Sequence, residues 1–163
     1  WFVLAQTDGE PLADSAQIPS WDEARALETL GVQRVPFDLT DGNVQGYAHG
    51  RSVAVSPIAA LPAKTLFHEL GHVLLNHTAE RGADQPDLPK TLTEAEAEAV
   101  ALLCLEALHL PGAEYTRGYI QSWYGAGNPL PEHSAQRIFK AADTILRAGR
   151  YDPKTEAAPG GAA

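Results

Sequence analysis

The sequence predicts an α+β domain, with a small mixed or antiparallel sheet near the N-terminus followed by a series of helices. Two observations support this class. Most of the strand-like segments lie before residue 56, and most of the segments with helical periodicity follow it. Strands grouped ahead of helices are typical of α+β folds, whereas a doubly wound sheet alternates the two. The 163 residues, of which 44% are hydrophobic and 20% charged, are enough for one soluble globular domain with its own core.

The first part of the chain is expected to contain one helix and three short strands. Ser20 and Glu23 have the spacing of a capping box, so we expect a helix from there to Gly31, a glycine suited to the residue after a helix. Strands are expected over residues 32–37, 44–48 and 51–55. The tight turn at His49 and Gly50 predicts that the last two strands form a hairpin.

Four helices are expected in the remainder of the chain. They cover residues 63–77, residues 91–108 or 93–108, residues 115–124 and residues 134–148. Residues 153–163 are rich in proline, glycine and alanine and are expected to form a disordered tail. We therefore expect one domain over residues 1–152 with a tail at 153–163.

The helix expected over residues 63–77 carries the strongest functional signal, the sequence His68-Glu69-Leu70-Gly71-His72. Residues four apart on a helix are separated by only about 40° around its axis, so His68 and His72 point the same way. Two neutral imidazoles on one face can bind Zn²⁺, with Glu69 beside them as a general base. The apolar residues on both sides of the motif agree with a buried helix.

A catalytic zinc site needs a third protein ligand in addition to two histidines. His77 is five residues after His72, about 140° further around a regular helix, so we expect it to lie at the surface or at the helix C-terminus. The next helix offers Glu94, Glu96 and Glu98 instead.

Glu96 is the favoured choice for the third ligand, because it shares a helix face with apolar residues expected to pack on the motif helix. Glu98 remains an alternative, since the whole segment after it is apolar. Glu96 also has the spacing of a capping box with Thr93, and Glu94 with Thr91, so either carboxylate could serve only to cap the helix.

Charge and composition limit the partners and the compartment. The net charge of −9 repels phosphate backbones, so direct nucleic-acid binding by this chain is not expected. No apolar run is long enough to cross a membrane, and the single cysteine, Cys104, fits a reducing, cytoplasmic compartment. The sequence contains no methionine, so we expect that further residues precede Trp1 in the parent protein.

Several segments resemble a known family of metallopeptidases. The motif helix followed by Glu96-Ala97-Glu98-Ala99-Val100-Ala101 resembles the gluzincin-type ImmA/IrrE group. The chain is more similar still to the C-terminal zincin-like domain of ArdC-type antirestriction proteins of mobile elements. The segments that carry this closer likeness are Gly42-Asn43, Gly46-Tyr47-Ala48, residues 52–56, Tyr119-Ile120 with Trp123, and residues 134–143.

The resemblance implies a zinc metallopeptidase with a zincin-like fold, with His68, His72 and Glu96 as metal ligands and Glu69 as the base. It also implies a single-stranded-DNA-binding domain upstream of Trp1 and a protein or peptide substrate. Two other functions stay open. The chain could be a non-catalytic acidic module that occupies restriction enzymes, or a regulatory protease that cleaves a repressor, as in the ImmA/IrrE group.

Two further features of a peptidase are expected from the sequence. A donor is needed for the oxyanion of the tetrahedral intermediate, and Tyr119 ranks ahead of the other candidates because it belongs to a family motif. The other candidates are Tyr124, His109 and His133. An extended substrate is expected to pair with the strand at Val53–Ser56, just before the motif helix.

Overall fold

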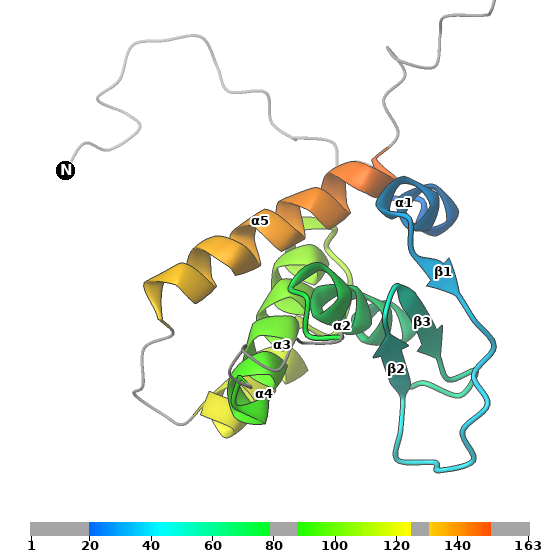
Figure 1. The fold of residues 1–163 in the computed structure, drawn as a ribbon, viewed down its shortest axis with the longest axis horizontal. Helices are drawn as coiled ribbons and strands as arrows, with labels where there is room; N and C mark the ends of the chain where they lie inside the picture. The colour runs from blue at the N-terminus through cyan, green and yellow to red at the C-terminus, as the bar shows by residue number, and fades with distance from the viewer. Residues whose placement is uncertain (1–19, 79–87, 125–130, 151–163) are drawn as a thin grey trace, which may run out of the picture.

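The computed structural model describes residues 20–78, 88–124 and 131–150, and within these residues the chain forms five helices and a three-stranded mixed sheet (Figure 1). The predicted α+β class is confirmed. The expected tail at 153–163 lies outside the described residues. In chain order the elements are α1 (Glu23–Leu30), β1 (Gln33–Arg34), β2 (Gly46–His49), β3 (Ser52–Val55), α2 (Pro62–Leu74), α3 (Lys90–Ala107), α4 (Ala113–Tyr124) and α5 (Glu132–Gly149).

The sheet has the strand order β1-β3-β2, so β3 lies in the middle and β2 at one end. The predicted hairpin is confirmed: β2 and β3 are antiparallel, with Gly46 opposite Val55, and Gly50 has the positive φ of 54° that the turn requires. Strand β1 runs parallel to β3 and is shorter than expected. Its last hydrogen bond to β3 is donated by the Val35 amide to the Val53 carbonyl, and Pro36 follows directly.

Helix α1 begins two to three residues later than the capping box predicted. The side chain of Asp22, and not that of Ser20, accepts a hydrogen bond from the Arg25 amide at 2.7 Å and caps the helix. The predicted end is confirmed, because Gly31 adopts the left-handed conformation with φ 61°. The capping boxes of Thr91 and Thr93 do not form, since α3 starts at Lys90 and both threonines lie inside it.

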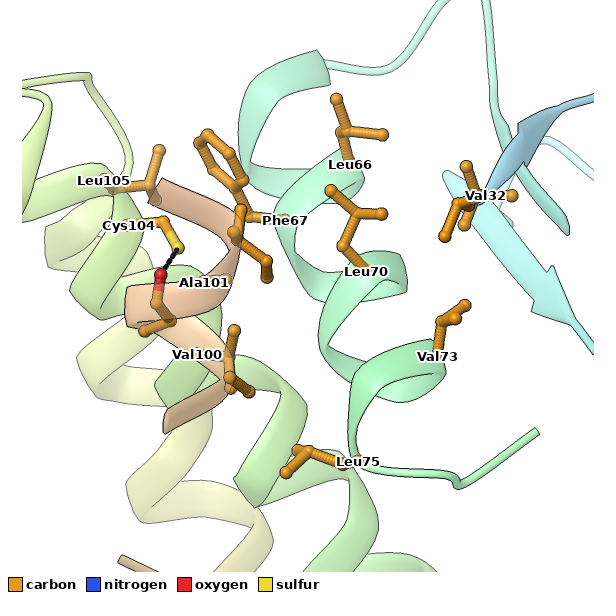
Figure 2. Close-up of a cluster of buried hydrophobic side chains, with 14 of the residues drawn as sticks. Val32, Leu66, Phe67, Leu70, Val73, Leu75, Val100, Ala101, Cys104 and Leu105 are labelled. Atoms are coloured by element: carbon orange, nitrogen blue, oxygen red, sulfur yellow. Dashed lines mark hydrogen bonds between the residues drawn. The ribbon is translucent and has the colours of Figure 1, made fainter. Parts of the chain in front are cut away.

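Helix α2 lies between the sheet and α3 and is the centre of the core (Figure 1). Leu66, Leu70 and Val73 recur every three to four residues and face the strands, as Figure 2 shows. Phe67 points to the other side, toward Cys104 and Leu105 of α3. The third face of α2 carries the polar residues of the motif.

The backbones of α2 and α3 approach each other closely at Gly71. A side chain there would place its Cβ 3.1 Å from the Ala97 Cα, which is tighter than ordinary packing. Glycine at this position and alanine at the facing one therefore bring the motif helix and the glutamate-rich start of α3 together. Helix α5 packs against α1 and α3 and closes the other side of the core. No helix in the described part of the chain is long and apolar enough to cross a membrane.

Candidate metal centre

The two motif histidines face each other on the polar side of α2, as their spacing predicts. The Nε2 atoms of His68 and His72 are 3.1 Å apart, and their rings meet edge to face. The two side chains retain 18% and 13% of their accessible surface, so both are reachable from solvent while held in place.

Glu94, from the first turns of α3, completes the group. Its Oε2 atom lies 3.4 Å from His68 Nε2 and 3.6 Å from His72 Nε2. Among the described residues, His68, His72 and Glu94 are the set of side chains whose ligand atoms lie close enough together to hold one metal ion. The group therefore can hold a metal.

The distances within this group suit a small tetrahedral ion. Bonds of about 2.0–2.1 Å at tetrahedral angles place two ligand atoms about 3.3–3.4 Å apart. The three separations of 3.1, 3.4 and 3.6 Å lie around that value. His68 is also oriented for a metal: its Nδ1 atom donates to Glu98 at 2.8 Å, so Nε2 is the atom that could bind a metal once its proton is displaced.

Glu96, which we expected as the third ligand, does not lie beside His68 and His72. Its side chain is fully buried, and its Oε2 atom accepts a hydrogen bond from His77 Nε2 at 2.9 Å. The physical reason is the helical period, which places Glu96 about 200° around α3 from Glu94 and therefore on another side of the helix. Glu98, the alternative ligand, supports His68 from behind and lies 2.7 Å from the Nζ atom of Lys64.

His77 was expected at the surface or at the helix C-terminus; it follows the end of α2 by three residues, but its side chain is not at the surface. Helix α2 ends at Leu74, and Asn76 takes a left-handed φ of 59°, so the chain turns back under the last turn of the helix. This brings His77 Nδ1 to 3.0 Å from His72 Nδ1 and leaves its side chain only 3% exposed. The prediction assumed a regular helix through residue 77, and that assumption was wrong.

The local charges explain how the carboxylates and imidazoles share protons when no metal is bound. Burial alone would lower the pKa of His68, but its hydrogen bonds to Glu94 and Glu98 outweigh burial and raise that pKa to about 9. Hydrogen bonds from His68 and His72 hold the pKa of Glu94 well below its usual range. Two anions around one imidazole form the kind of site in which a cation replaces the proton.

Glu69 lies on the same face of α2 and is buried. Burial is the main cause that raises its pKa above the usual value, against the opposing effect of the two histidines. Strand β2 passes directly over it: a Cβ atom at Gly46 would lie 3.1 Å from Glu69 Oε1 and 2.5 Å from Thr65 Cγ2. Only glycine at this position lets the strand approach the carboxylate so closely.

The site opens into a cleft of about 420 Å³ between β2, α2 and the start of α3. Its lining residues are Gly46, Ala48, His49, His68, Glu69, His72, His77, Thr78, Thr93 and Glu94. A metal held by the two histidines and Glu94 would therefore face an open space large enough for part of a substrate.

The candidate oxyanion donors that the structure describes do not line this cleft. Tyr119 is about half exposed on α4, where its ring lies 5.0 Å from the Nζ atom of Lys64. His109 and His133 are exposed on other parts of the molecule, and the side chain of Tyr124 lies outside the described residues. The ranking of Tyr119 from sequence therefore has no support from its position.

Glu94 is the site residue whose role sequence reasoning missed, although a signal was present. Glu94 and Glu98 are four residues apart, like His68 and His72, so they point the same way from α3. Glu96 was favoured from sequence because it has the most apolar helix face, whereas a ligand in an open site has to lie at the edge of the core.

The chain was compared with family models, with curated proteins and with solved structures, and none of them matches it.

Proposed function

We propose that this chain is a zinc metallopeptidase domain that hydrolyses peptide bonds, with His68, His72 and Glu94 as the metal ligands and Glu69 as the general base. The observation that carries the proposal is the group of two imidazole nitrogens and one carboxylate oxygen, separated by 3.1–3.6 Å, at the bottom of an open cleft. Three protein ligands with space for a further one are typical of catalytic zinc.

The neighbouring Glu69 favours zinc hydrolysis over other chemistry of the same ligand set. Two histidines and one carboxylate also bind non-haem iron in oxygenases. A carboxylate held between the ligands by the His-Glu-x-x-His spacing has a use in hydrolysis, where a base must take a proton from water. A site that only stabilised the fold would have no use for it.

Zinc, when bound, supplies a Lewis acid that activates water and polarises the scissile carbonyl. The residues of the chain would transfer the proton and orient the ligands. Glu69 accepts the proton of the attacking water and passes it to the leaving amine. Burial raises the pKa of Glu69 toward the range in which a carboxylate can do both. Glu98 holds the His68 ring from its Nδ1 side, which keeps the Nε2 lone pair toward the ligand group.

An extended peptide is the substrate that the cleft fits best, because a strand at the end of the sheet forms one of its walls. Strand β2 contributes Gly46, Ala48 and His49 to the lining. Among the residues that the structure describes, β2 pairs with β3 on one side alone, whereas β3, the strand expected from sequence to receive the substrate, is paired on both sides. Backbone pairing along β2 would recognise an extended chain largely independently of its sequence.

The wider biological role follows from the resemblance of several segments to ArdC-type antirestriction proteins and to the ImmA/IrrE group. We propose that the domain acts in the cytoplasm on a protein involved in DNA defence. A repressor protein as substrate is the alternative from the same resemblance. The net charge of −9 favours a second candidate, an acidic module that binds a restriction enzyme without cleaving it.

The test compares the wild-type chain with Glu69→Gln and, as a control, Glu106→Gln, which changes an exposed glutamate on α3. Metal content is measured by mass spectrometry, and cleavage is followed on a mixed-sequence peptide library. We expect one zinc per chain in all three proteins and a loss of about 10²–10⁴ in turnover for Glu69→Gln alone.

Three results would contradict the proposal. Failure of the wild type to take up zinc at micromolar concentration would exclude the metal centre. Equal hydrolysis by wild type and Glu69→Gln would exclude Glu69 as the base. Stable zinc binding with no hydrolysis of any peptide would favour the binding module.

A further inference from the structure

A chain of polar side chains leads from the metal centre into the core behind His72. The Nδ1 atom of His72 lies 3.0 Å from Nδ1 of His77, and Nε2 of His77 lies 2.9 Å from Oε2 of Glu96. The exposed fraction falls along the chain from 13% to 3% and then to 0%. Glu96 therefore sits at the buried end, where an ionised carboxylate is costly unless it has partners.

The backbone is built to bring His77 into this chain. Asn76 adopts the left-handed conformation with φ 59°, which is uncommon for residues other than glycine. The amide of His77 then donates to the carbonyl of His72 at 2.9 Å. The two rings are held 5.2 Å apart, centroid to centroid, by this turn.

Arg137 of α5 connects the buried end of the chain to the rest of the fold. Its guanidinium lies 3.8 Å from Glu96 Oε1 and donates to the carbonyl of Leu75, just after α2. A fixed positive charge at this position favours the ionised form of Glu96. An ionised carboxylate can only accept hydrogen bonds, so the hydrogen between Glu96 and His77 must lie on His77 Nε2.

The positions of the remaining hydrogens follow from this one. A neutral His77 with its hydrogen on Nε2 has a lone pair on Nδ1, which can only accept. The short contact between the two Nδ1 atoms then requires the hydrogen on His72 Nδ1. A histidine that binds a metal is neutral and has one ring hydrogen, so in the metal-loaded protein the Nε2 atom of His72, which faces His68 and Glu94, would provide the lone pair.

We propose that His77 and Glu96 are positioning residues that fix the tautomer and ring orientation of the metal ligand His72. The inference rests on the proposed metal centre. It assigns to each ligand histidine its own buried carboxylate: Glu98 acts on His68 directly, and Glu96 acts on His72 through an intervening imidazole. It also gives Glu96 a function toward the metal without making it a ligand.

The tautomer of His77 tests the proposal directly. Long-range proton–nitrogen NMR correlation on the zinc-loaded, ¹⁵N-labelled chain distinguishes a protonated ring nitrogen from one with a free lone pair. The resonances of His77 are assigned by their loss in His77→Asn. We expect a hydrogen on Nε2 and none on Nδ1. A hydrogen on Nδ1 of His77, alone or together with one on Nε2, would overturn the proposal.

Zinc affinity provides the second test, measured by competition with a chelator of known affinity. His77→Phe keeps a ring but removes both nitrogens, and we expect it to weaken zinc binding by about 10–100-fold. His77→Asn places an amide oxygen near the position of Nδ1, so it should restore part of the affinity. The control is His133→Phe, an exposed histidine on α5, which should bind zinc like the wild type.

Glu96→Gln serves as the variant that retains His77. Its amide group can donate to His77 Nε2 and so favour the wrong tautomer, and we expect a similar loss of affinity. Melting of the metal-free proteins is measured in parallel, because a purely structural pair would lower the melting temperature and leave the affinity of the folded protein unchanged.

The outcomes separate this inference from the proposed function. A wild type that takes up no zinc excludes the metal centre, and the inference with it. A wild type that binds zinc, together with unchanged affinity in His77→Phe and Glu96→Gln, overturns this inference alone. Equal losses in His77→Phe and His77→Asn also overturn it, since the acceptor atom would then not be what His72 needs.

Discussion

At the residue scale, the three glutamates spaced two apart on α3 differ in their sets of neighbours. Glu94 faces the two motif histidines, Glu98 contacts His68 and Lys64, and Glu96 is buried against His77. The sequence was sufficient to predict that this helix supplies a carboxylate to the motif. It was not sufficient to select which one, because that choice depends on the rotation of α3 about its own axis, which tertiary packing sets.

The choice of Glu94 as metal ligand over Glu96 and Glu98 can be tested by measuring the zinc affinity of variants. We expect Glu94→Ala to lose more zinc affinity than the roughly 10–100-fold that removal of a supporting partner costs, because it removes a proposed metal ligand. Glu98→Gln and Glu96→Gln should stay within that range, and Glu106→Ala, exposed on the same helix, should bind normally. A larger loss in Glu96→Gln than in Glu94→Ala would return Glu96 to the metal.

The burial of Cys104 predicts that its thiol reacts slowly in the native protein. It is fully buried in the core beside Leu105 (Figure 2), and burial raises the pKa of its thiol to about 12. Because the thiolate is the reactive form, the native protein should react with a thiol reagent at pH 8 only as fast as the core opens. The measurement compares the labelling rate in native buffer with the rate in guanidinium chloride. Labelling within seconds in native buffer would contradict the burial of this residue.

At the element scale, periodicity and turn chemistry predicted which helices and strands form. They predicted less well the residues at which those elements begin and end. The motif helix, the hairpin and the helix ended by Gly31 follow from local sequence. The end of α2 at Leu74 does not, because the residues up to His77 retain helical spacing. After the turn at Asn76, the His77 side chain contacts His72 of α2 and Glu96 of α3, and the contact with α3 is not visible in the local sequence.

Substitution of Gly46 tests whether the close approach of β2 to α2 is needed for stability and for the position of Glu69. A Cβ atom there would meet Thr65 and the Ala54 carbonyl at 2.5 and 2.9 Å, both too close for a real contact. We expect Gly46→Ala to lower the free energy of unfolding by about 1–3 kcal/mol, as overpacking does, and to displace Glu69. Urea unfolding measures the first effect and peptide cleavage the second.

The control for this change is Gly42→Ala in the exposed turn before β2. A Cβ atom at Gly42 would have no other atom within 4 Å, so the free energy of unfolding should change by less than about 0.5 kcal/mol. Equal effects of the two substitutions would show that glycine flexibility, and not the close approach of the strand, determines the result.

At the scale of the whole molecule, the cleft is assembled from three segments that are separate in sequence. The lining residues of one wall come from β2, those of the floor from α2 and those of another wall from the start of α3. Local patterns predicted the floor with its His68, Glu69 and His72. The walls could not be predicted, because they depend on the strand order that puts β2 at the end of the sheet and on the close approach of α3 at Gly71.

The net charge of the chain predicts that it binds nucleic acid weakly. A chain with net charge −9 is repelled by phosphate backbones, so we expect dissociation constants for single- and double-stranded DNA weaker than about 10⁻⁴ M at 150 mM salt. Fluorescence anisotropy with labelled oligonucleotides measures this at 150 and 50 mM salt. A protein with 6–10 phosphate contacts loses about 10³–10⁵ in affinity between 50 and 200 mM salt, whereas an acidic chain should show no such salt dependence. Sub-micromolar binding that strengthens at low salt would reveal a basic surface that the net charge conceals, and DNA would then have to be considered as a partner of this domain.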